Sequence, residues 1–491
     1  MSQPDAAASP SLAQRAVRGV AWTLSTTLAS RAVGLVGTLL LARYLAPAEY
    51  GEVSAAAILA ATANTVTGFG VGIYLVSHRD VSRAEAFHAT SWYLVTGIAA
   101  MAGMWALTGP LAAWSDAPHL ERFMPVFLAS AMLERIAFLP ERMLVRKLRF
   151  RWLSLARAFA ELAYTGVSLG MAALGFGAMA IAWGNLARSS LRFCAIVPVV
   201  GWREWLEPHR LRLATMTRIV GYGLNVSATN VATFAMSRWD NLLVSRYFGP
   251  AAMGAYNYAY NLADAPAQAI GEQMGDVIGA SFPHVDGEKR AATLVRAFTM
   301  ISLIMLPMAF GLAAVSQTVV ETFFSQRWSS VGMMLAFLSV LAAMRPMAQI
   351  VVSYHYAADR VRVVLWLEWL TLAAIVGAIS TVGRIGIRWT CGSVAAAFVL
   401  RTLAALWTVR RLDRVPLSSF LLPLTGPLVA CVTMVAAILL ARPSLADLSP
   451  ALRLALEAVL GAAVYLAGAL LVFRSASREF LRLARSALFH R

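Results

Sequence analysis

Charged side chains occur inside long apolar stretches of this sequence. There they are unfavourable unless they face water or one another, so each needs a partner or a polar surrounding. The guanidinium of arginine is planar, permanently charged and able to bind a phosphate group through two donors at once. The arginines that we predict to line an anion-binding cavity are Arg31, Arg135, Arg188, Arg345 and Arg401. The alternative for each is a structural role, such as the ion pair that the four-residue spacing of Arg157 and Glu161 allows.

A second set of polar residues recurs at every fourth position. Its members are Tyr256, Tyr260, Asp264, Gln268, Glu272 and Asp276. On a helix this spacing drifts by only about 40° per step, so the three acids share one broad face. A carboxylate on such a face can take up a proton or Na⁺, which makes Asp264 the preferred candidate for ion coupling and Glu272 and Asp276 further candidates. The alternative is that Glu272 and Asp276 approach a helix end and are solvated.

Apolar residues dominate the whole chain and predict the elements that carry these side chains. Of the 491 residues, 59% are hydrophobic and 14% are charged, and the mean hydropathy is +0.65. Runs of about twenty apolar residues are long enough to cross a bilayer as helices. They lie at 18–43, 51–77, 88–113, 122–145, 151–174, 176–200, 217–246, 251–281, 293–315, 331–356, 362–382, 387–410, 419–441 and 452–473. The sequence therefore predicts an all-α polytopic membrane protein with about fourteen transmembrane helices.

The basic residues that give the chain its formal net charge of +17 are distributed according to the same topology. Most basic residues fall in alternate segments between the spans, and positively charged segments stay on the cytoplasmic side of a membrane. The densest cluster is Arg142, Arg146, Lys147, Arg149 and Arg151. If this cluster is cytoplasmic, the alternation of the segments places both termini in the cytoplasm as well, which requires an even number of spans. Because topology explains the charge, no nucleic acid partner is expected.

An internal repeat divides the chain. The segment ARYLAPAEYG at 42–51 matches SRYFGPAAMG at 245–254, with five identities in ten positions and an offset of 203 residues. Both copies lie where an odd-numbered helix turns into the next, so Pro47, Gly51, Pro250 and Gly254 are predicted to form equivalent turns. We expect two parallel six-helix bundles and an extra helix pair, the usual plan of secondary transporters. The predicted divisions are a cytoplasmic tail 1–17, a first lobe 18–200, a cytoplasmic linker 201–216, a second lobe 217–410, helices 13 and 14 at 411–473 and a basic cytoplasmic tail 474–491.

Two segments carry a resemblance to a known family. Residues 18–80, RGVAWTLSTTLASRAVGLVGTLLLARYLAPAEYG onward, resemble the N-terminal region of the polysaccharide-transport branch of the multidrug/oligosaccharidyl-lipid/polysaccharide exporter superfamily. Residues 238–266, followed by Pro283, resemble the seventh and eighth helices of the same family. The resemblance implies a flippase of the bacterial inner membrane that moves undecaprenyl-pyrophosphate-linked oligosaccharide by alternating access around a cationic cavity, for O-antigen, capsule or exopolysaccharide export. It implies partners among membrane lipids and among polysaccharide polymerase and export proteins, and it leaves the glycan open.

Other functions lack the residues that they need. A nucleotide-binding loop requires a lysine after a glycine, whereas only Lys147 and Lys289 occur and neither follows one. The histidines show no paired spacing, so no metal and no cofactor are expected. The longest predicted extracytoplasmic loop, at 316–330, holds one acid, Glu321, which disfavours a membrane glycan polymerase or ligase and any enzymatic activity. A small-molecule or drug antiporter of the same superfamily remains the alternative, although such a cavity is expected to be richer in acids than in bases.

Overall fold

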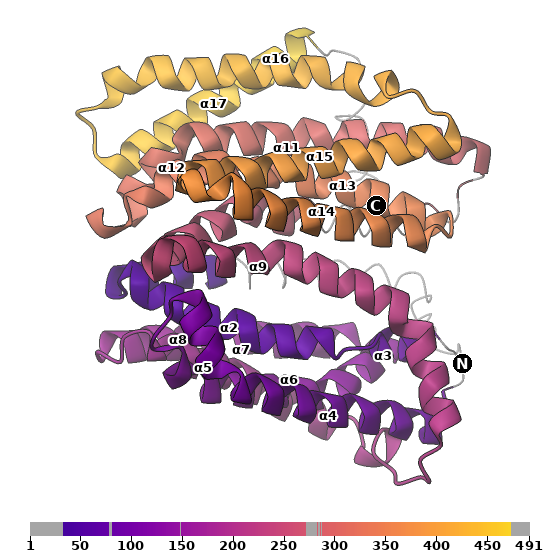
Figure 1. Ribbon diagram of the computed structural model, residues 1–491. Coiled ribbons are helices and arrows are strands. Elements are labelled where there is room, and N and C mark those ends of the chain that lie inside the picture. Colours follow the sequence, from indigo (N-terminus) through magenta and orange to yellow (C-terminus); the bar gives the residue numbers. More distant parts are fainter. Residues whose placement is uncertain are drawn as a thin grey trace, which may run out of the picture. The chain divides into compact units, whose positions relative to one another are not determined.

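The protein is helical throughout the part of the chain that the computed structural model describes, which is residues 33–77, 81–147, 149–271, 282, 285 and 287–472 (Figure 1). These ranges contain helices and turns and no strand, so the predicted all-α class is confirmed. Of the predicted functional residues, Arg31, Glu272 and Asp276 lie outside the described residues.

Six helical segments account for the predicted spans up to residue 200. In chain order they are Val33–Tyr44, α2 with α3 (Pro47–Val66 and Val71–Ser77), α4 with α5 (Arg83–Ala106 and Thr108–Ser115), α6 (Leu120–Arg146), α7 (Phe150–Ala173) and α8 (Met179–Ile196). Two of the segments are interrupted. Phe69 and Gly70, between α2 and α3, have positive φ angles of 44° and 62°, and α4 and α5 meet at an angle of 56°.

Local sequence signals explain where these helices begin. Pro47 opens α2 at the first helical position, where its missing N–H costs no hydrogen bond, and the Glu49 carboxylate accepts a hydrogen bond from the Ala46 N–H at 2.9 Å. Before α4, the Ser82 N–H donates to Glu85 and the Glu85 N–H donates to the Ser82 hydroxyl. This reciprocal pair is a capping box, which satisfies two N–H groups that the helix leaves open.

The second half contains eight further predicted spans, and each has a helical counterpart. They are α9 (Leu213–Pro266) followed by the π-helical turn η3 (Ala267–Gly271), α11 (Gly287–Phe323), α12 with α13 (Ser330–Leu338 and Leu341–Ala357), α14 (Val361–Thr381), α15 (Ile387–Asp413), α16 (Ser418–Ala441) and α17 (Pro450–Val472). The element α9 covers two spans because Gly249, with a φ of 81°, breaks it just before Pro250. The predicted loop at 316–330 is shorter than expected, since α11 continues to Phe323.

Charged residues within some helices reduce their apolar character. Among the described residues, seven helices are by themselves long and apolar enough to cross a membrane, and the bent pair α4 and α5 would make an eighth. The helix α7 is not among the seven, because Arg157 and Glu161 interrupt its apolar run. By contrast, the helical segments that carry Arg135, Arg345 and Arg401 stay apolar enough to pass the same test.

The chain packs as two compact units. Among the described residues, the first unit comprises 33–41, 67–105 and 123–224, and the second comprises 42–66, 106–122 and 225–472. Within its described residues, the first unit has a small apolar core around Tyr74 and Tyr93 and another around Leu153 and Trp205. The core of the second unit is larger and joins α11, α13, α15, α16 and α17. Two of the first-half segments that pass from one unit to the other are interrupted close to the crossing, at 67–70 and at 107, whereas Val33–Tyr44 and α6 pass without a break.

Candidate functional site

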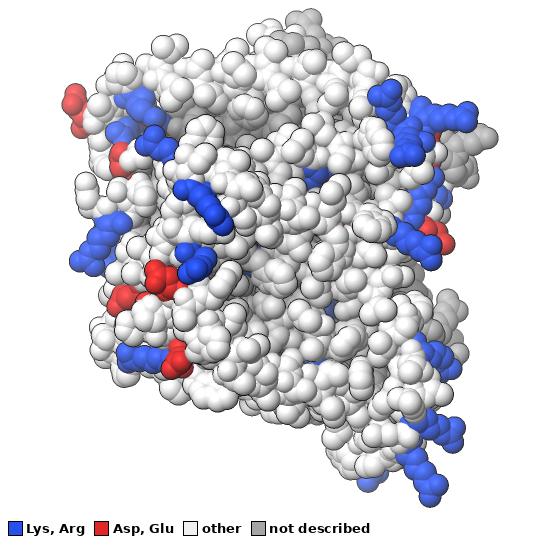
Figure 2. Space-filling view, viewed as in Figure 1, with Lys and Arg blue, Asp and Glu red and all other residues white. Residues whose placement is uncertain are grey.

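Charge is distributed unevenly along the helices. On the face that Figure 2 shows, lysine and arginine gather near the two ends of the helices, and the stretch between them has few charged residues. Arg135, Arg188, Arg345, Arg401 and Asp264 all lie within described helices.

In the second unit, Arg345 and Asp264 form an ion pair. The Arg345 Nη1 donates to the Asp264 Oδ2 at 2.5 Å, and the Gln268 Nε2 donates to the same oxygen at 2.6 Å. Arg345 also contacts the Ser237 hydroxyl at 3.3 Å through its Nη2. The residue predicted to bind an anion and the residue predicted to bind a cation thus neutralise each other in this structure.

The four-residue spacing after Tyr256 has a structural consequence on each turn. The Tyr256 hydroxyl donates to the Asp240 Oδ2 at 2.7 Å, which joins the two halves of α9. One turn later the buried Tyr260 lies near Arg345, Asp264 and Asp240. Another turn later come Asp264 and then Gln268, which are paired as described above. The described repeat positions therefore take part in two separate hydrogen-bonded groups, Tyr256 with Asp240 and Gln268 with Asp264 and Arg345, with Tyr260 between them.

Arg401 is buried and paired within the same unit. Its Nη2 donates to the Glu368 Oε1 at 2.5 Å, and both side chains are almost completely enclosed between α14 and α15. A pair of this kind neutralises two charges inside the bundle and holds two adjacent helices together. That Arg401 contacts the substrate stays a prediction, and its ion pair with Glu368 can be explained without it.

In the first unit, Arg135 supports the interruption between α2 and α3. It is completely buried, and it donates to the Thr67 carbonyl at 2.9 Å, the Thr67 hydroxyl at 2.9 Å and the Tyr93 carbonyl at 2.6 Å. Its guanidinium also lies 3.9 Å from the ring centre of Tyr93. Thr67 directly follows the last residue of α2, so Arg135 bonds backbone atoms that the interrupted helix leaves open. This is a structural function, and substrate contact by Arg135 stays a prediction.

Arg188 lies beside three polar partners. Its Nη1 is 3.9 Å from the Glu161 carboxylate, its Nη2 donates to Asn185, and the guanidinium is 5.2 Å from the ring centre of Tyr164. About a third of the side chain is exposed, at 36%. Of the two predicted arginines described in this unit, Arg188 is the one whose side chain is partly exposed.

Sequence reasoning missed a cluster of three charged side chains in this unit. Arg157 and Arg192 both donate to the Glu141 carboxylate, which is buried. The expected pair of Arg157 with Glu161 is wrong, because Arg157 turns to α6 and Glu161 lies nearer Arg188. The signal was present in the sequence: Arg157 and Glu161, and Arg188 and Arg192, are each one helical turn apart on consecutive helices. Spacing alone does not show which faces meet.

The four residues of the internal repeat meet in the second unit. A Cβ added to Gly51 would lie 1.9 Å from the Pro250 carbonyl oxygen, and a Cβ added to Gly254 would lie 2.0 Å from the Pro47 carbonyl oxygen. The contact is reciprocal, with each glycine facing the proline of the other copy. Tyr50 stacks on Tyr258 beside it, with ring centres 4.1 Å apart. Only glycine allows two helix starts to approach this closely.

The chemistry that these residues offer is charge compensation. Among the described residues, no group of three His, Cys, Asp or Glu side chains is placed to hold a metal ion. The polar groups instead form arginine–carboxylate pairs in or near the middle of helical spans. Such pairs mark an ion or substrate path in a membrane protein. Fold and site together therefore define a polytopic all-α membrane transporter.

Comparison with known proteins identifies the family. The family described as "Polysaccharide biosynthesis protein" matches residues 40–333, more than half of the chain, and the chain belongs to this family. The succinoglycan biosynthesis transport protein ExoT of Rhizobium meliloti (strain 1021) is 23% identical over 96% of each chain. The lipopolysaccharide biosynthesis protein WzxC of Escherichia coli (strain K12) is 21% identical over 77% of this chain and 78% of its own.

Solved structures agree on the fold. The lipid II flippase MurJ, in an inward closed conformation, superposes with a TM-score of 0.78 at 14% identity and covers 92% of this chain and 98% of its own. An inward-facing multidrug resistance MATE family transporter superposes with a TM-score of 0.62 at 16% identity, covering 80% of this chain and 98% of its own. The predicted superfamily is thereby confirmed. The protein is a multi-pass transporter of the bacterial inner membrane and not an enzyme.

Proposed function

We propose that this protein is a flippase that moves undecaprenyl-pyrophosphate-linked oligosaccharide across the inner membrane for polysaccharide export. The observation that carries the proposal is the end-to-end similarity to a polysaccharide transport protein, combined with arginines in mid-span positions. A lipid-linked pyrophosphate carries two negative charges, and fixed guanidinium groups lower the free energy of placing it in an apolar region.

Within this proposal, Arg31, Arg135, Arg188, Arg345 and Arg401 are the candidate substrate contacts, and Asp264, Glu272 and Asp276 are the candidate ion-coupling residues. The contacts favour Arg345 and Arg188, because their side chains are partly exposed, whereas Arg135 and Arg401 are enclosed. Asp264 is favoured among the acids because it is buried beside Arg345. We further propose cytoplasmic termini and association with polysaccharide polymerase and export proteins.

A reconstitution experiment tests the proposed function. Vesicles containing the purified chain and a fluorescent polyprenyl-pyrophosphoryl oligosaccharide are exposed to a quencher that does not cross the membrane. We expect the protected fraction of the label to become accessible in vesicles that contain the chain and to stay protected in empty vesicles. Unchanged protection, with export of a cationic dye instead, would favour the small-molecule antiporter.

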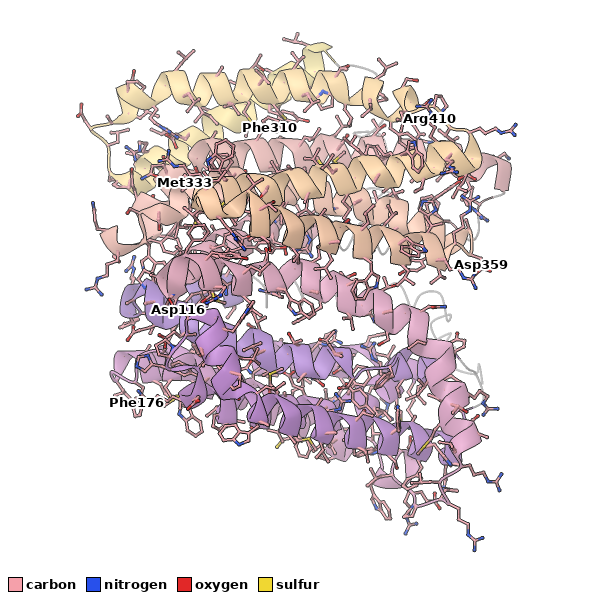
Figure 3. The ribbon with its side chains drawn as sticks, in the orientation of Figure 1. Asp116, Phe176, Phe310, Met333, Asp359 and Arg410 are labelled. Carbon is pink, nitrogen blue, oxygen red and sulfur yellow. The ribbon has the colours of Figure 1, made fainter. Side chains whose placement is uncertain are left out.

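Topology gives a second prediction. In a Cys194→Ser background, which removes the exposed native cysteine, Ser329→Cys should react in intact cells with a thiol reagent that does not cross the membrane. Asp359→Cys should react only after the membrane is permeabilised. Both positions are exposed in the second unit. Figure 3 shows Asp359 at one end of the helices and Met333, four residues after Ser329, toward the other. Labelling of Asp359→Cys in intact cells would reverse the proposed orientation.

A further inference from the structure

The ion pair between Arg345 and Asp264 joins the middles of two spans. Arg345 is the sixteenth of the 28 residues in the helical segment Ser330–Ala357, and Asp264 lies fourteen residues after Pro250 on α9. The two side chains differ in exposure, with 22% of Arg345 accessible but only 3% of Asp264. Arg345 is therefore the more accessible partner of the pair.

The hydrogen bonding of Asp264 is incomplete. Its Oδ2 accepts from both Arg345 and Gln268, whereas its Oδ1 is buried and has no hydrogen-bond partner among the described residues. A buried carboxylate oxygen without a donor is unfavourable. Arg345 thus contacts Asp264 through one oxygen only, and it supplies the opposite charge that this buried carboxyl group faces.

Both backbones are weakened next to the pair. Pro266 follows Asp264 by two residues and leads directly into the π-helical turn η3, and Pro346 directly follows Arg345. The two helices are also in close contact here, since a Cβ added to Gly271 would lie 2.3 Å from the Pro346 ring. Proline removes a backbone hydrogen bond, and single π turns occur frequently at functional sites. If the Arg345–Asp264 ion pair opens and a new partner takes its place, few regular backbone hydrogen bonds therefore have to break in the two helices.

We infer that the substrate pyrophosphate displaces Asp264 from Arg345 and that the released carboxylate takes up one proton. The inference rests on the proposed function. A dianion bound beside an ionised Asp264 would leave three negative charges facing one arginine at the centre of the span. Forming an O–H bond on Asp264 with a proton from water removes one of these charges, so the occupied site crosses the membrane with less uncompensated charge. Substrate release returns the proton and restores the ion pair.

The charged groups around Tyr260, one helical turn before Asp264, have partners of their own. The described ones are Arg345 on α13 and Asp240, Asp264 and Arg238 on α9. Asp240 accepts hydrogen bonds from Tyr256 and Asn241, and Arg238 contacts Asn261 at 3.3 Å. Asp264 is thus the carboxylate in this group that pairs with the arginine that the substrate would take.

The linkage predicts how affinity depends on pH. If one proton is taken up with each substrate, the dissociation constant decreases about tenfold for each unit that the pH is lowered, within the range where Asp264 is ionised in the free protein and protonated in the complex. The probe is a polyprenyl pyrophosphate diester carrying one sugar, whose own acid groups stay ionised throughout. Its binding to the full chain in nanodiscs is measured by calorimetry between about pH 5 and pH 8, in buffers with different ionisation enthalpies.

Two variants isolate the carboxylate. Asp264→Asn should bind the probe with an affinity that does not vary with pH and with an uptake of about zero protons, against about one for the wild type. Glu457→Gln is the matched control and should behave like the wild type. Glu457 is equally buried in the second unit, pairs with Arg442 at 3.1 Å, and likewise has one carboxylate oxygen without a hydrogen-bond partner among the described residues.

A spectroscopic measurement makes the test independent of the stability of the variant. Infrared difference spectra of the wild-type chain should gain the C=O band of a protonated carboxyl group when the probe is added. Wild-type binding without this band, or proton uptake that persists in Asp264→Asn, would overturn the inference and leave the flippase proposal intact. Failure of the wild type to bind the probe at any pH would remove the proposed function, and this inference with it.

Discussion

Arg345→Ala should lower polysaccharide export by roughly 10- to 100-fold or more, because a hydrogen bond between charged groups contributes about 1.5–3 kcal/mol. Arg345→Lys should restore only part of the activity, since it keeps the charge and loses the two-donor geometry that fits a phosphate. The measurement is the amount of exported glycan in a strain that depends on this gene, divided by the amount of protein in the membrane.

The ion pair complicates the interpretation of this variant, and a second substitution resolves it. Arg345→Ala leaves Asp264 buried without its arginine, and removing one partner of a buried pair typically costs about 3–5 kcal/mol. We therefore expect less Arg345→Ala protein in the membrane. The double variant Arg345→Ala with Asp264→Asn removes both charges and should recover the protein level but not the export.

Exposed arginines provide the control. Arg327 lies in the short turn η5 (Gln326–Trp328) and is exposed, so Arg327→Ala should export glycan like the wild type. If the double variant exports normally at wild-type abundance, Arg345 does not contact the substrate. The assignment would then move to Arg188, which is the other partly exposed candidate among the described arginines.

The sequence predicts the helices of this protein well because the apolar runs are long. Each predicted span has a helical counterpart in the described residues, even where the helix is interrupted, as at Gly249 inside α9. The repeated segments at 42–51 and 245–254 also direct attention to residues that the structure brings together. Both signals are local, since they depend on hydrophobicity and on glycine and proline at turns.

The partners of the arginines are not predictable in the same way. Arg157 has Glu161 one turn away and still pairs with Glu141 on another helix. Arg345 pairs with Asp264, which is 81 residues distant in the chain. A charged side chain in an apolar bundle binds whichever opposite charge its helix faces, and helix rotation is set by the packing of all neighbours. Local spacing shows that a pair is possible, whereas the tertiary structure decides which pair forms.

Gly51→Ala and Gly254→Ala should each strongly reduce export, and by similar amounts. The added Cβ atoms would lie 1.9 Å and 2.0 Å from the carbonyl oxygens of Pro250 and Pro47. Because these are backbone atoms, no side-chain rotation relieves the clash, and the two helix starts must separate. Overpacking of this kind costs about 1–3 kcal/mol, and helices held apart at this contact cannot reach the state described here.

A glycine with open space at the position of an added Cβ provides the matched control for these variants. Gly392 lies within α15 in the same unit, and a Cβ added there meets no atom within 4 Å. Gly392→Ala should export normally and stabilise the helix by up to about 1 kcal/mol, through the higher helix propensity of alanine. The measurements are exported glycan, membrane abundance and the thermal unfolding of the purified chain.

The reciprocal contact also predicts how the double variant, with both glycines replaced by alanine, should behave. Gly51→Ala and Gly254→Ala separate the same two backbone segments, so once one alanine has forced them apart the second meets less resistance. The effects of the two single variants on the free energy of unfolding should therefore sum to clearly more than the effect of the double variant, with a coupling energy of about 0.5–3 kcal/mol. The same relation should hold for their effects on export. Full additivity would show that the two glycines act at separate contacts. Normal export by both single variants would show that the close approach of Pro47 and Pro250 is not needed for transport.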